Sequence, residues 1–213
     1  MDLPLFQDNL RSSSGWLAEL ERERPAWNAS LYSNLRERIS EAERPAYDLV
    51  PEWTVISPVG ISLIHLVLVN SALTGQHPAM SRREDTLRNT EAAPFVEGHD
   101  PVPAVILQRI LDNALDWFRT DSFNELHPVE QAALVLLRLF DLQPFPSHNL
   151  ETAIISASFY TMRANLPPLV MHDDSEMKAR FDAALRAAFR MLTQPLVEAI
   201  AENLTGTIRM ITR

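Results

Sequence analysis

Residues 126–171 read LHPVEQAALVLLRLFDLQPFPSHNLETAIISASFYTMRANLPPLVM, and this stretch decides the fold of the chain. It predicts two helices joined by a short loop. Pro128 stands in the first turn of the first helix, where its missing N–H group costs nothing. The residues that follow leave almost no polar face, as expected of a buried helix. The apolar ones are Leu134, Val135, Leu136, Leu137, Leu139, Phe140 and Leu142.

Two prolines end this first helix. Pro144 and Pro146 lie in the segment QPFPSHN at 143–149, which cannot continue a helix. A second helix is predicted from residue 149 or 150 to about residue 165, where the sequence LPP stops it. The stretch therefore places a polar loop at the N-terminus of a buried helix.

This loop lacks what a phosphate site at a helix N-terminus requires. The free N–H groups there attract anions, but glycines are needed to wrap a phosphate and cations to neutralise it. Residues 143–149 contain neither. Glu151 in the first turn gains about 0.3–1 kcal/mol from the helix dipole. Ser147 or Asn149 can cap the helix, which is then expected to need no ligand.

The stretch resembles the Fic (Fido) family, whose members carry a loop H-P-F-x-[D/E]-G-N-G-R-x-x-R between two buried helices. Residues 143–154 fit that frame without a gap. The segment LPPLV at 166–170 is similar to the turn that often follows in the family. The motif residues that match are Pro144, Phe145 and Asn149.

The reactive positions of the motif carry other residues. The resemblance implies AMP transfer from ATP to a protein hydroxyl, which needs a base that titrates near neutral pH, an acid that holds Mg²⁺, and arginines that pair with phosphates. The residues present cannot supply these roles, so ordinary AMP transfer is not expected. The replacements are Gln143 for the catalytic His, Ser147 for the acid, His148 and Leu150 for two glycines, and Glu151 and Ile154 for two arginines.

Some functional roles within the loop stay open. Asn149 and Thr152 are the residues left for nucleotide contact. His148 could act as a displaced base, or could form half of a metal site with Glu151 at i+3, although a solvated surface histidine is the simpler interpretation. We expect no metal site. We also expect no cofactor, with Mg²⁺ and ATP required only if the chain is an active transferase.

Two other segments are similar to regulatory and target-binding parts of the family. The sequence NSALTG at 70–75 resembles the inhibitory segment S-x-x-x-E-G, with Asn70 and Gly75 at its ends. Thr74 replaces the Glu of that segment, as Ile154 replaces its Arg partner. The flap, which holds a target strand in the family, is expected at Phe95 and Val96. The alternative for this flap segment is a plain loop with Phe95 in the core.

The N-terminal third is predicted to be a helical arm, residues 1–59, packed on a Fic-like domain of residues 60–213. Helices are expected at 16–23 and from Pro25 onward, and residues 45–58 are expected to be irregular. Residues 61–73 predict a buried helix stopped by Thr74 and Gly75, with His65 as a core histidine.

The remaining segments complete an all-α, Fic-type helical bundle with at most a small β-hairpin flap. An amphipathic helix is predicted at 103–120. A second is predicted at 176–191, after an N-cap within 172–175, and a last one starts at 193–195. The two domains together are expected to form one structural unit.

Composition narrows the classes of partner. The 213 residues carry a net charge of −9, which argues against nucleic acid or an anionic membrane as the main partner. There are no cysteines, so disulfides and thiol catalysis are excluded. No basic segment leads into an apolar one near the start, and the apolar run at 61–73 is too short to span a bilayer. We expect a cytoplasmic protein.

Three functions follow from these observations. The first is a catalytically silent Fic-like protein that binds a protein partner through the flap and the cleft of the motif loop. The second is a transferase that moves a nucleotidyl or phosphate-containing group to protein hydroxyls with non-standard residues. The third is a scaffold protein that associates through its N-terminal arm. Oligomerisation is left open.

Overall fold

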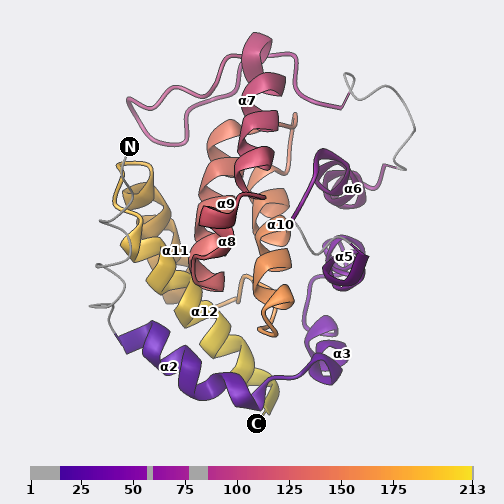
Figure 1. Ribbon diagram of the computed structural model, residues 1–213, viewed down its shortest axis with the longest axis vertical. Helices are drawn as coiled ribbons and strands as arrows, with labels where there is room; N and C mark the ends of the chain where they lie inside the picture. The colour runs from indigo at the N-terminus through magenta and orange to yellow at the C-terminus, as the bar shows by residue number, and fades with distance from the viewer. Residues whose placement is uncertain (1–14, 57–59, 77–85, 213) are drawn as a thin grey trace.

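The computed structural model describes residues 15–56, 60–76 and 86–212. These residues form helices joined by loops, with no strand among them, so the all-α prediction is confirmed. Two helices, α9 (Pro128–Leu142) and α10 (Asn149–Arg163), lie side by side at the centre of the molecule (Figure 1). Every residue of α10 from Thr152 to Thr161 is buried. The stretch that we expected to decide the fold therefore forms its core.

Local caps explain where α9 and α10 begin and end. His127 caps α9: its Nδ1 accepts the Val129 N–H at 3.3 Å, while Glu130 accepts the His127 N–H at 2.9 Å. The α10 helix ends in a Schellman turn, with Asn165 left-handed at φ 56° and the Leu166 N–H donating to the Thr161 carbonyl at 2.9 Å. Both boundaries agree with the prediction to within two residues.

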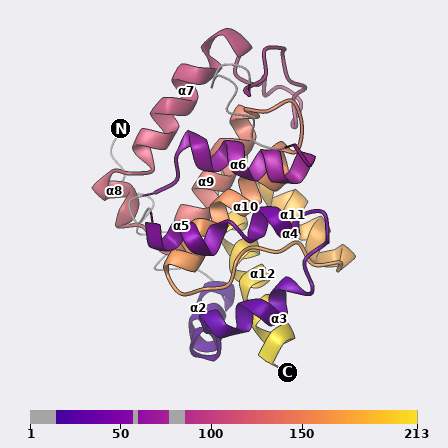
Figure 2. The ribbon, with the colours of Figure 1, turned by 90° about the vertical axis from the view of Figure 1, so that its right-hand side faces the viewer.

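Helices cover the central pair from two sides. On one side α12 (Gln194–Thr212) packs against α9, α11 (Ser175–Ala188) and α2 (Gly15–Glu23). On the other side α5 (Val50–Ile56) and α6 (Leu63–Thr74) cross α10 (Figure 2). The α7 helix (Ala104–Trp117) packs on α9. The short α8 (Asp121–Asn124) follows α7 and leads into α9. No described helix combines the length and apolar character needed to cross a membrane.

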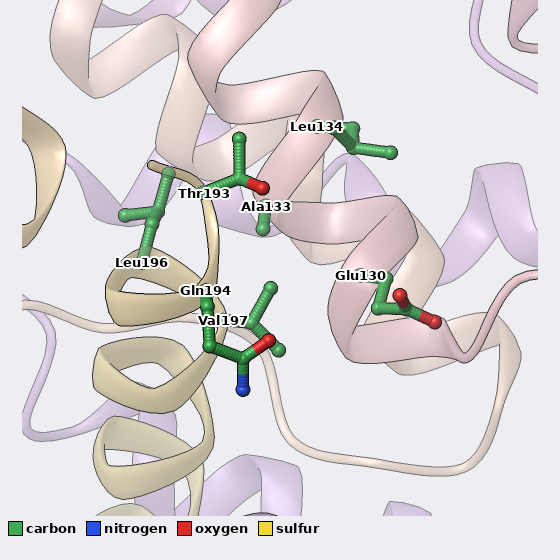
Figure 3. A pocket seen from close by; sticks show the side chains of 7 residues that line it. All are labelled: Glu130, Ala133, Leu134, Thr193, Gln194, Leu196 and Val197. Atoms are coloured by element: carbon green, nitrogen blue, oxygen red, sulfur yellow. The ribbon is translucent and has the colours of Figure 1, made fainter. Parts of the chain in front are cut away.

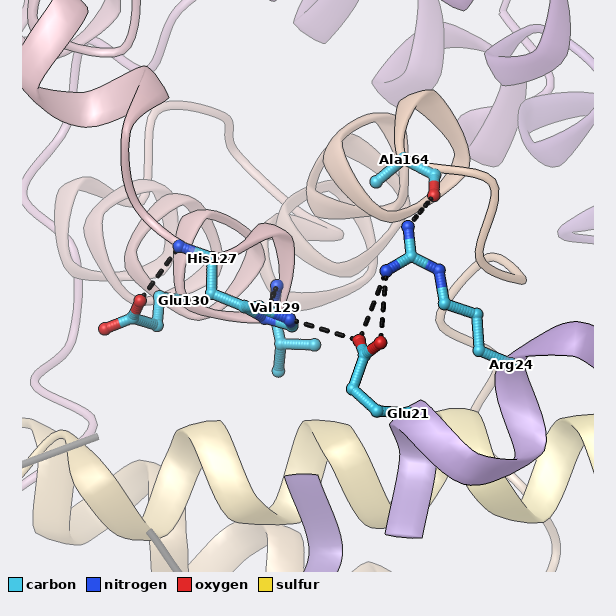
Figure 4. Close-up of polar contacts among 6 residues, drawn as sticks. All are labelled: Glu21, Arg24, His127, Val129, Glu130 and Ala164. Atoms are coloured by element: carbon cyan, nitrogen blue, oxygen red, sulfur yellow. Dashed lines mark hydrogen bonds and ion pairs between the residues drawn. The ribbon is translucent and has the colours of Figure 1, made fainter. Parts of the chain in front are cut away.

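Polar contacts join α2 and the residue that follows it, Arg24, to both central helices (Figure 4). Glu21 lies 3.2 Å from the Nη1 of Arg24 and 3.2 Å from the Nε2 of His127, at the start of α9. Arg24 also donates to the carbonyl of Ala164, the C-cap residue of α10. Segments that are more than 100 residues apart in the chain are thus held together at one end of the bundle.

The prediction of a single helix from Pro25 onward is wrong. The chain instead forms η1 (Arg24–Ala26), η2 (Ala29–Leu31) and α3 (Tyr32–Arg36). The break has a local cause: Trp27 is extended at ψ 140°, and the Asn28 side chain accepts the Ser30 N–H at 3.0 Å and so starts a new turn. The apolar residues still reach the core, because Trp27, Leu35 and Ile39 are buried and Leu31 packs against them.

The prediction that residues 45–58 are irregular is also wrong for the residues that the structure describes. It contains α4 (Arg44–Tyr47) and α5, and residues 57–59 lie outside the described part. Pro45 and Pro51 both stand in the first turn of a helix, where proline is favoured. The prolines that suggested irregular chain therefore start helices here.

The helix predicted at 61–73 is confirmed as α6, and Gly75 ends it with a left-handed φ of 65°. It is not buried on all sides, because only Leu63, Leu66 and Val69 are buried and Ile64 is 59% exposed.

The prediction of a core histidine in α6 needs correction. His65 lies in the first turn and is only half-buried, and its Nδ1 accepts the Ser62 N–H at 3.0 Å. Its ring contacts Trp53 at 4.5 Å between centroids. Burial lowers the pKa of this imidazole, with Arg119 acting in the same direction. His65 therefore closes a capping box on α6.

The C-terminal helices follow the prediction closely. Asp174 caps α11, and its Oδ1 accepts the N–H groups of Glu176 and Met177 at 2.9 Å each. The helix ends at Ala188, three residues before the predicted end at 191. The α12 helix starts at Gln194, as expected.

Candidate functional site

The loop between α9 and α10 is closed by one side chain. Asn149 accepts the Phe145 N–H at its Oδ1 and donates from Nδ2 to the Phe145 carbonyl, both at 2.8 Å. Phe145 itself is buried. The expectation that Asn149 or Ser147 caps α10 is wrong, because the N-cap residue is His148 and no side chain caps that end. Asn149 holds the loop in shape and is not free for a ligand.

Two residues of the loop have left-handed backbone. Gln143 has φ 43° and His148 has φ 56°, although neither is glycine. His148 stands at a position where the Fic motif has glycine, so the backbone keeps the conformation that glycine favours while the side chain differs. A histidine in this conformation is unusual and carries a cost of about 1–2 kcal/mol.

The structure brings the predicted motif positions together on the loop and the first turn of α10. Ser147 and His148 are exposed, Leu150 and Glu151 are half-buried, and Ile154 is buried. The Gln143 side chain donates from Nε2 to the Ala93 carbonyl at 3.1 Å, and so bonds to the segment before the flap. Within the described part, no three or more His, Cys, Asp or Glu side chains gather as a metal site would need.

The inhibitory-like segment of α6 lies against this loop. Asn70 donates from Nδ2 to the Ser147 carbonyl at 2.9 Å and to the Thr152 hydroxyl at 3.1 Å. Thr152 is buried, so this contact occupies the hydroxyl considered for nucleotide binding. Thr74 bonds within its own helix, to the Asn70 carbonyl at 3.0 Å, and Gly75 serves as the helix cap. The two segments meet through Asn70.

Arg88 is a residue of this site that sequence analysis missed. It is 5% exposed, and its backbone N–H donates to the Pro144 carbonyl at 2.9 Å. Burial lowers its pKa, and Glu91 opposes that shift. Its charge lies at the C-terminus of α9, where the helix dipole is negative. A single Arg in a polar segment gives no sequence signal for this role. The guanidinium donates to the backbone carbonyls of Gln143 (2.7 Å), Thr90 (2.9 Å), Leu142 (3.2 Å) and Val102.

The flap segment is a loop packed on the core. Phe95 contacts Phe140 and Phe189 at 4.9 and 5.4 Å between ring centroids. The Arg186 guanidinium lies 4.4 Å from the centroid of the Phe95 ring and donates to the Phe95 carbonyl at 3.2 Å. Val96 is buried. Residues 86–103 contain no strand, so the hairpin is not present there and the plain-loop alternative is confirmed.

Two cavities lie along α9 and neither is lined by the motif loop. The first lies between α9 and the start of α12, and its lining includes Glu130, Ala133 and Leu134 of α9 and Gln194 and Val197 of α12 (Figure 3). It leaves room for about one water molecule. The second lies between the C-terminal ends of α7 and α11 and has a volume of about 550 Å³, its mouth included.

The proteins that this chain resembles in sequence are described as Fic protein adenylyltransferases. The chain is 27% identical to the protein adenylyltransferase fic-1 of Caenorhabditis briggsae over 124 residues, which are 58% of this chain and 24% of that protein. It is 28% identical to the protein adenylyltransferase Fic of Drosophila grimshawi over 114 residues, 54% of this chain and 23% of that protein. The chain thus spans about a quarter of the length of these relatives. No family model matches the sequence.

The solved structures that resemble this chain in fold are also Fic proteins. Fic-1 from C. elegans has a TM-score of 0.63 and 21% identity, and the match covers 81% of this chain and 52% of that one. A Fic domain containing signaling protein from Bacteroides thetaiotaomicron has a TM-score of 0.64 and 14% identity, with 81% and 69% covered. IbpAFic2 covalently tethered to Cdc42 has a TM-score of 0.55 and 14% identity, with 91% and 63% covered. In sequence and in fold, this chain is therefore similar to proteins of the Fic/Fido family.

Proposed function

We propose that this chain is a Fic-type domain that does not transfer AMP and that acts by binding a protein partner. The observation that carries the proposal is the set of side chains on the loop at 143–154. A general base, a carboxylate for Mg²⁺ and cations for a triphosphate are all needed there. At the positions where the motif has these groups, the loop and the first turn of α10 carry none of them.

The missing base is the most direct argument. A base must exchange a proton near neutral pH, and the amide of Gln143 has no such equilibrium. This amide also donates to the Ala93 carbonyl, so it has a structural bond in place of a reactive one. The side chain at the family's base position thus fastens the loop to its neighbour.

The residues present also do not fit Mg²⁺ and ATP. Ser147 offers a neutral hydroxyl where Mg²⁺ prefers a carboxylate. Glu151 places a negative charge where an Arg would meet a phosphate, and two like charges 4 Å apart repel by about 4 kcal/mol at an effective dielectric constant near 20. Asn149 is committed to Phe145. We therefore derive no catalytic step through the nucleotide.

Binding a protein partner is the function that we propose for a Fic-type domain without these catalytic groups. The loop has an exposed tip formed by Pro146, Ser147 and His148. Asn70 of α6 bonds to the Ser147 carbonyl and so holds α6 next to this tip. One structural neighbour, IbpAFic2, has been solved tethered to Cdc42. We propose that the loop and the neighbouring flap segment contact the partner through exposed side chains, since residues 86–103 offer no strand for pairing.

A second candidate rests on His148. Its side chain is exposed and makes no capping bond to α10, so it is available to a substrate. In this alternative the chain transfers a nucleotidyl or phosphate-containing group to a protein hydroxyl, with His148 as the base and Mg²⁺ and ATP supplied together.

A labelling experiment separates the two candidates. The purified chain is incubated with α-³²P-ATP, Mg²⁺ and a cell lysate, and an active Fic protein adenylyltransferase serves as the positive control. The proposal predicts no labelled protein above a reaction without the chain. Labelling that His148→Ala abolishes would establish the transferase alternative. Labelling that survives His148→Ala would contradict both candidates and point to another base.

A further inference from the structure

The larger cavity has apolar walls and room for a small ligand. Its lining comes from the C-terminal end of α7, from α9, and from the C-terminal end of α11 with the residues after it. The volume of about 550 Å³ includes its open mouth, and the space that a water-sized sphere can reach is about 200 Å³. That is below the range of roughly 300–1,000 Å³ typical of sites for drug-sized ligands, but above the roughly 150 Å³ of an apolar cavity that binds benzene. The apolar walls of the larger cavity come from Trp117, Leu134, Leu137, Ala188 and Phe189.

The chain leaves this cavity open although apolar side chains are available at its mouth. Met191 has a left-handed φ of 67° and turns the chain away after α11. Its side chain is 88% exposed, and Leu192 beside it is 62% exposed. Met191 lines the mouth of the cavity, and its flexible thioether can adapt to what enters. An apolar body in the cavity would bury surface that now faces water.

One end of the cavity is polar and already organised. Asp141 lies 2.6 Å from the Nε2 of His99 through one oxygen and 2.8 Å from the Nη1 of Arg138 through the other. Both oxygens of this carboxylate therefore have a partner. A cationic ligand would find no free carboxylate among the residues that line the cavity.

Arg138 supplies the free donors at this end. A guanidinium has five N–H groups in a rigid fork, and in the described part of the chain Arg138 uses only its Nη1, towards Asp141. The contact to Asp141, three residues along the same helix, holds the fork in place before a ligand arrives. The remaining N–H groups suit a planar acceptor with two oxygens, because a carboxylate pairs with arginine through two parallel hydrogen bonds.

We propose that this cavity binds a small aromatic carboxylic acid. The ring would lie against Trp117 and Phe189, whose faces favour offset or edge-to-face contact with another aromatic ring. The carboxylate would pair with Arg138. This site is separate from the loop at 143–154, which contributes no residue to its lining. Binding at this cavity is therefore independent of whether the chain transfers AMP.

Calorimetry with a matched pair of probes tests the proposal. The full chain is titrated with 2-naphthoate and, separately, with the neutral 2-naphthamide. We expect 2-naphthoate to bind one-to-one, and Arg138→Gln to weaken it about tenfold or more, since a hydrogen bond to a charged group contributes about 1.5–3 kcal/mol. The amide should bind more weakly, and Arg138→Gln should change its affinity little.

Two further variants separate the cavity from nonspecific association. Leu137→Trp adds an indole within the cavity walls and should abolish binding of both probes. Arg109→Gln removes an exposed arginine of α7 and should change nothing, so it controls for charge. Circular dichroism verifies that each variant is folded. The proposal is overturned if 2-naphthoate does not bind at millimolar concentration, if Leu137→Trp still binds it, or if Arg138→Gln weakens acid and amide equally.

Discussion

Arg88 is the residue on which the conformation of the motif loop depends most. Its guanidinium and its backbone N–H together bind the carbonyls of Leu142, Gln143 and Pro144 at the end of α9, and those of Thr90 and Val102 in the flap segment. A buried arginine with this many backbone partners fixes two loops to one another. It also leaves little freedom for either loop to close over a substrate.

Replacing Arg88 should destabilise the protein more than a typical substitution. We expect Arg88→Met to lower the free energy of unfolding by about 2–4 kcal/mol, because several buried carbonyls lose their donor. Arg88→Lys keeps the charge but not the fork, and should lose less. Urea unfolding measures both, with Arg109→Gln as the exposed control. A loss below about 0.5 kcal/mol for Arg88→Met, the range of surface substitutions, would contradict the role assigned to Arg88.

At this scale the sequence predicted where the candidate residues lie but not what each one does. Gln143, Ser147 and His148 were expected in the loop and Glu151 in the first turn of the next helix, and they lie there. The bonds of Asn149 to Phe145 could not be predicted, since any capping residue reads alike in sequence. Arg88 gave no signal because its partners are backbone carbonyls, which every residue carries.

The start of α9 shows how one element depends on a titrating side chain. The Nδ1 of His127 accepts the Val129 N–H, and its Nε2 contacts Glu21 (Figure 4). Burial lowers the pKa of His127, and Glu21 only partly offsets that effect. The unfolded chain therefore takes up a proton on His127 at higher pH than the folded chain does. Stability from this group is present above the ordinary histidine pKa of about 6.5 and is lost as pH falls below it.

Removing the titration should flatten this pH dependence. Asn is a good N-cap, so we expect His127→Asn to keep α9 capped and to lose less stability than the wild type as pH falls. Urea unfolding at about pH 7.5 and about pH 5.5 gives the change for each protein. His65 and His172, whose pKa values burial also lowers, remain in both proteins and cancel in the comparison. Equal losses in the two proteins would show that His127 does not contribute.

The elements themselves were predicted well wherever local caps define them. Pro128, the prolines after α9 and Asp174 mark helix ends through effects that reach only a few residues, namely the missing N–H of proline and the capping bonds of Asp174. The errors fall in residues 24–56, where Pro25 was expected to start one long helix and Pro45 and Pro51 were expected to lie in irregular chain. Proline fits the first turn of a helix as well as it ends one, so spacing alone could not separate these cases.

At the scale of the whole molecule, the described part of the N-terminal arm, residues 15–56, contributes side chains to the core. The side chains of Leu20, Leu35 and Val50 are fully buried. The α2 helix packs along α12, where Arg209 pairs with Glu23 at 2.9 Å and with Glu19. We propose that residues 1–59 and 60–213 fold as one unit and not as an arm added to a finished domain.

A truncated chain tests this arrangement. We expect residues 60–213 alone to lose cooperative unfolding, since each buried aliphatic side chain of the arm contributes about 1.5–3 kcal/mol and typical net stability is only about 5–15 kcal/mol. Circular dichroism during heating is the measurement. A chain that begins at Gly15 keeps every contact described here and is the control. A cooperative transition of the truncated chain at the wild-type temperature would contradict the proposal.

The central claim is that the motif loop has lost nucleotide chemistry, and calorimetric titration with ATP tests it most directly. The full chain is titrated with and without Mg²⁺, and an active Fic protein adenylyltransferase is titrated in parallel. We predict no binding heat at millimolar ATP in either condition, because the loop offers no cation and Glu151 repels the phosphates. Micromolar, Mg²⁺-dependent binding of ATP would contradict this account.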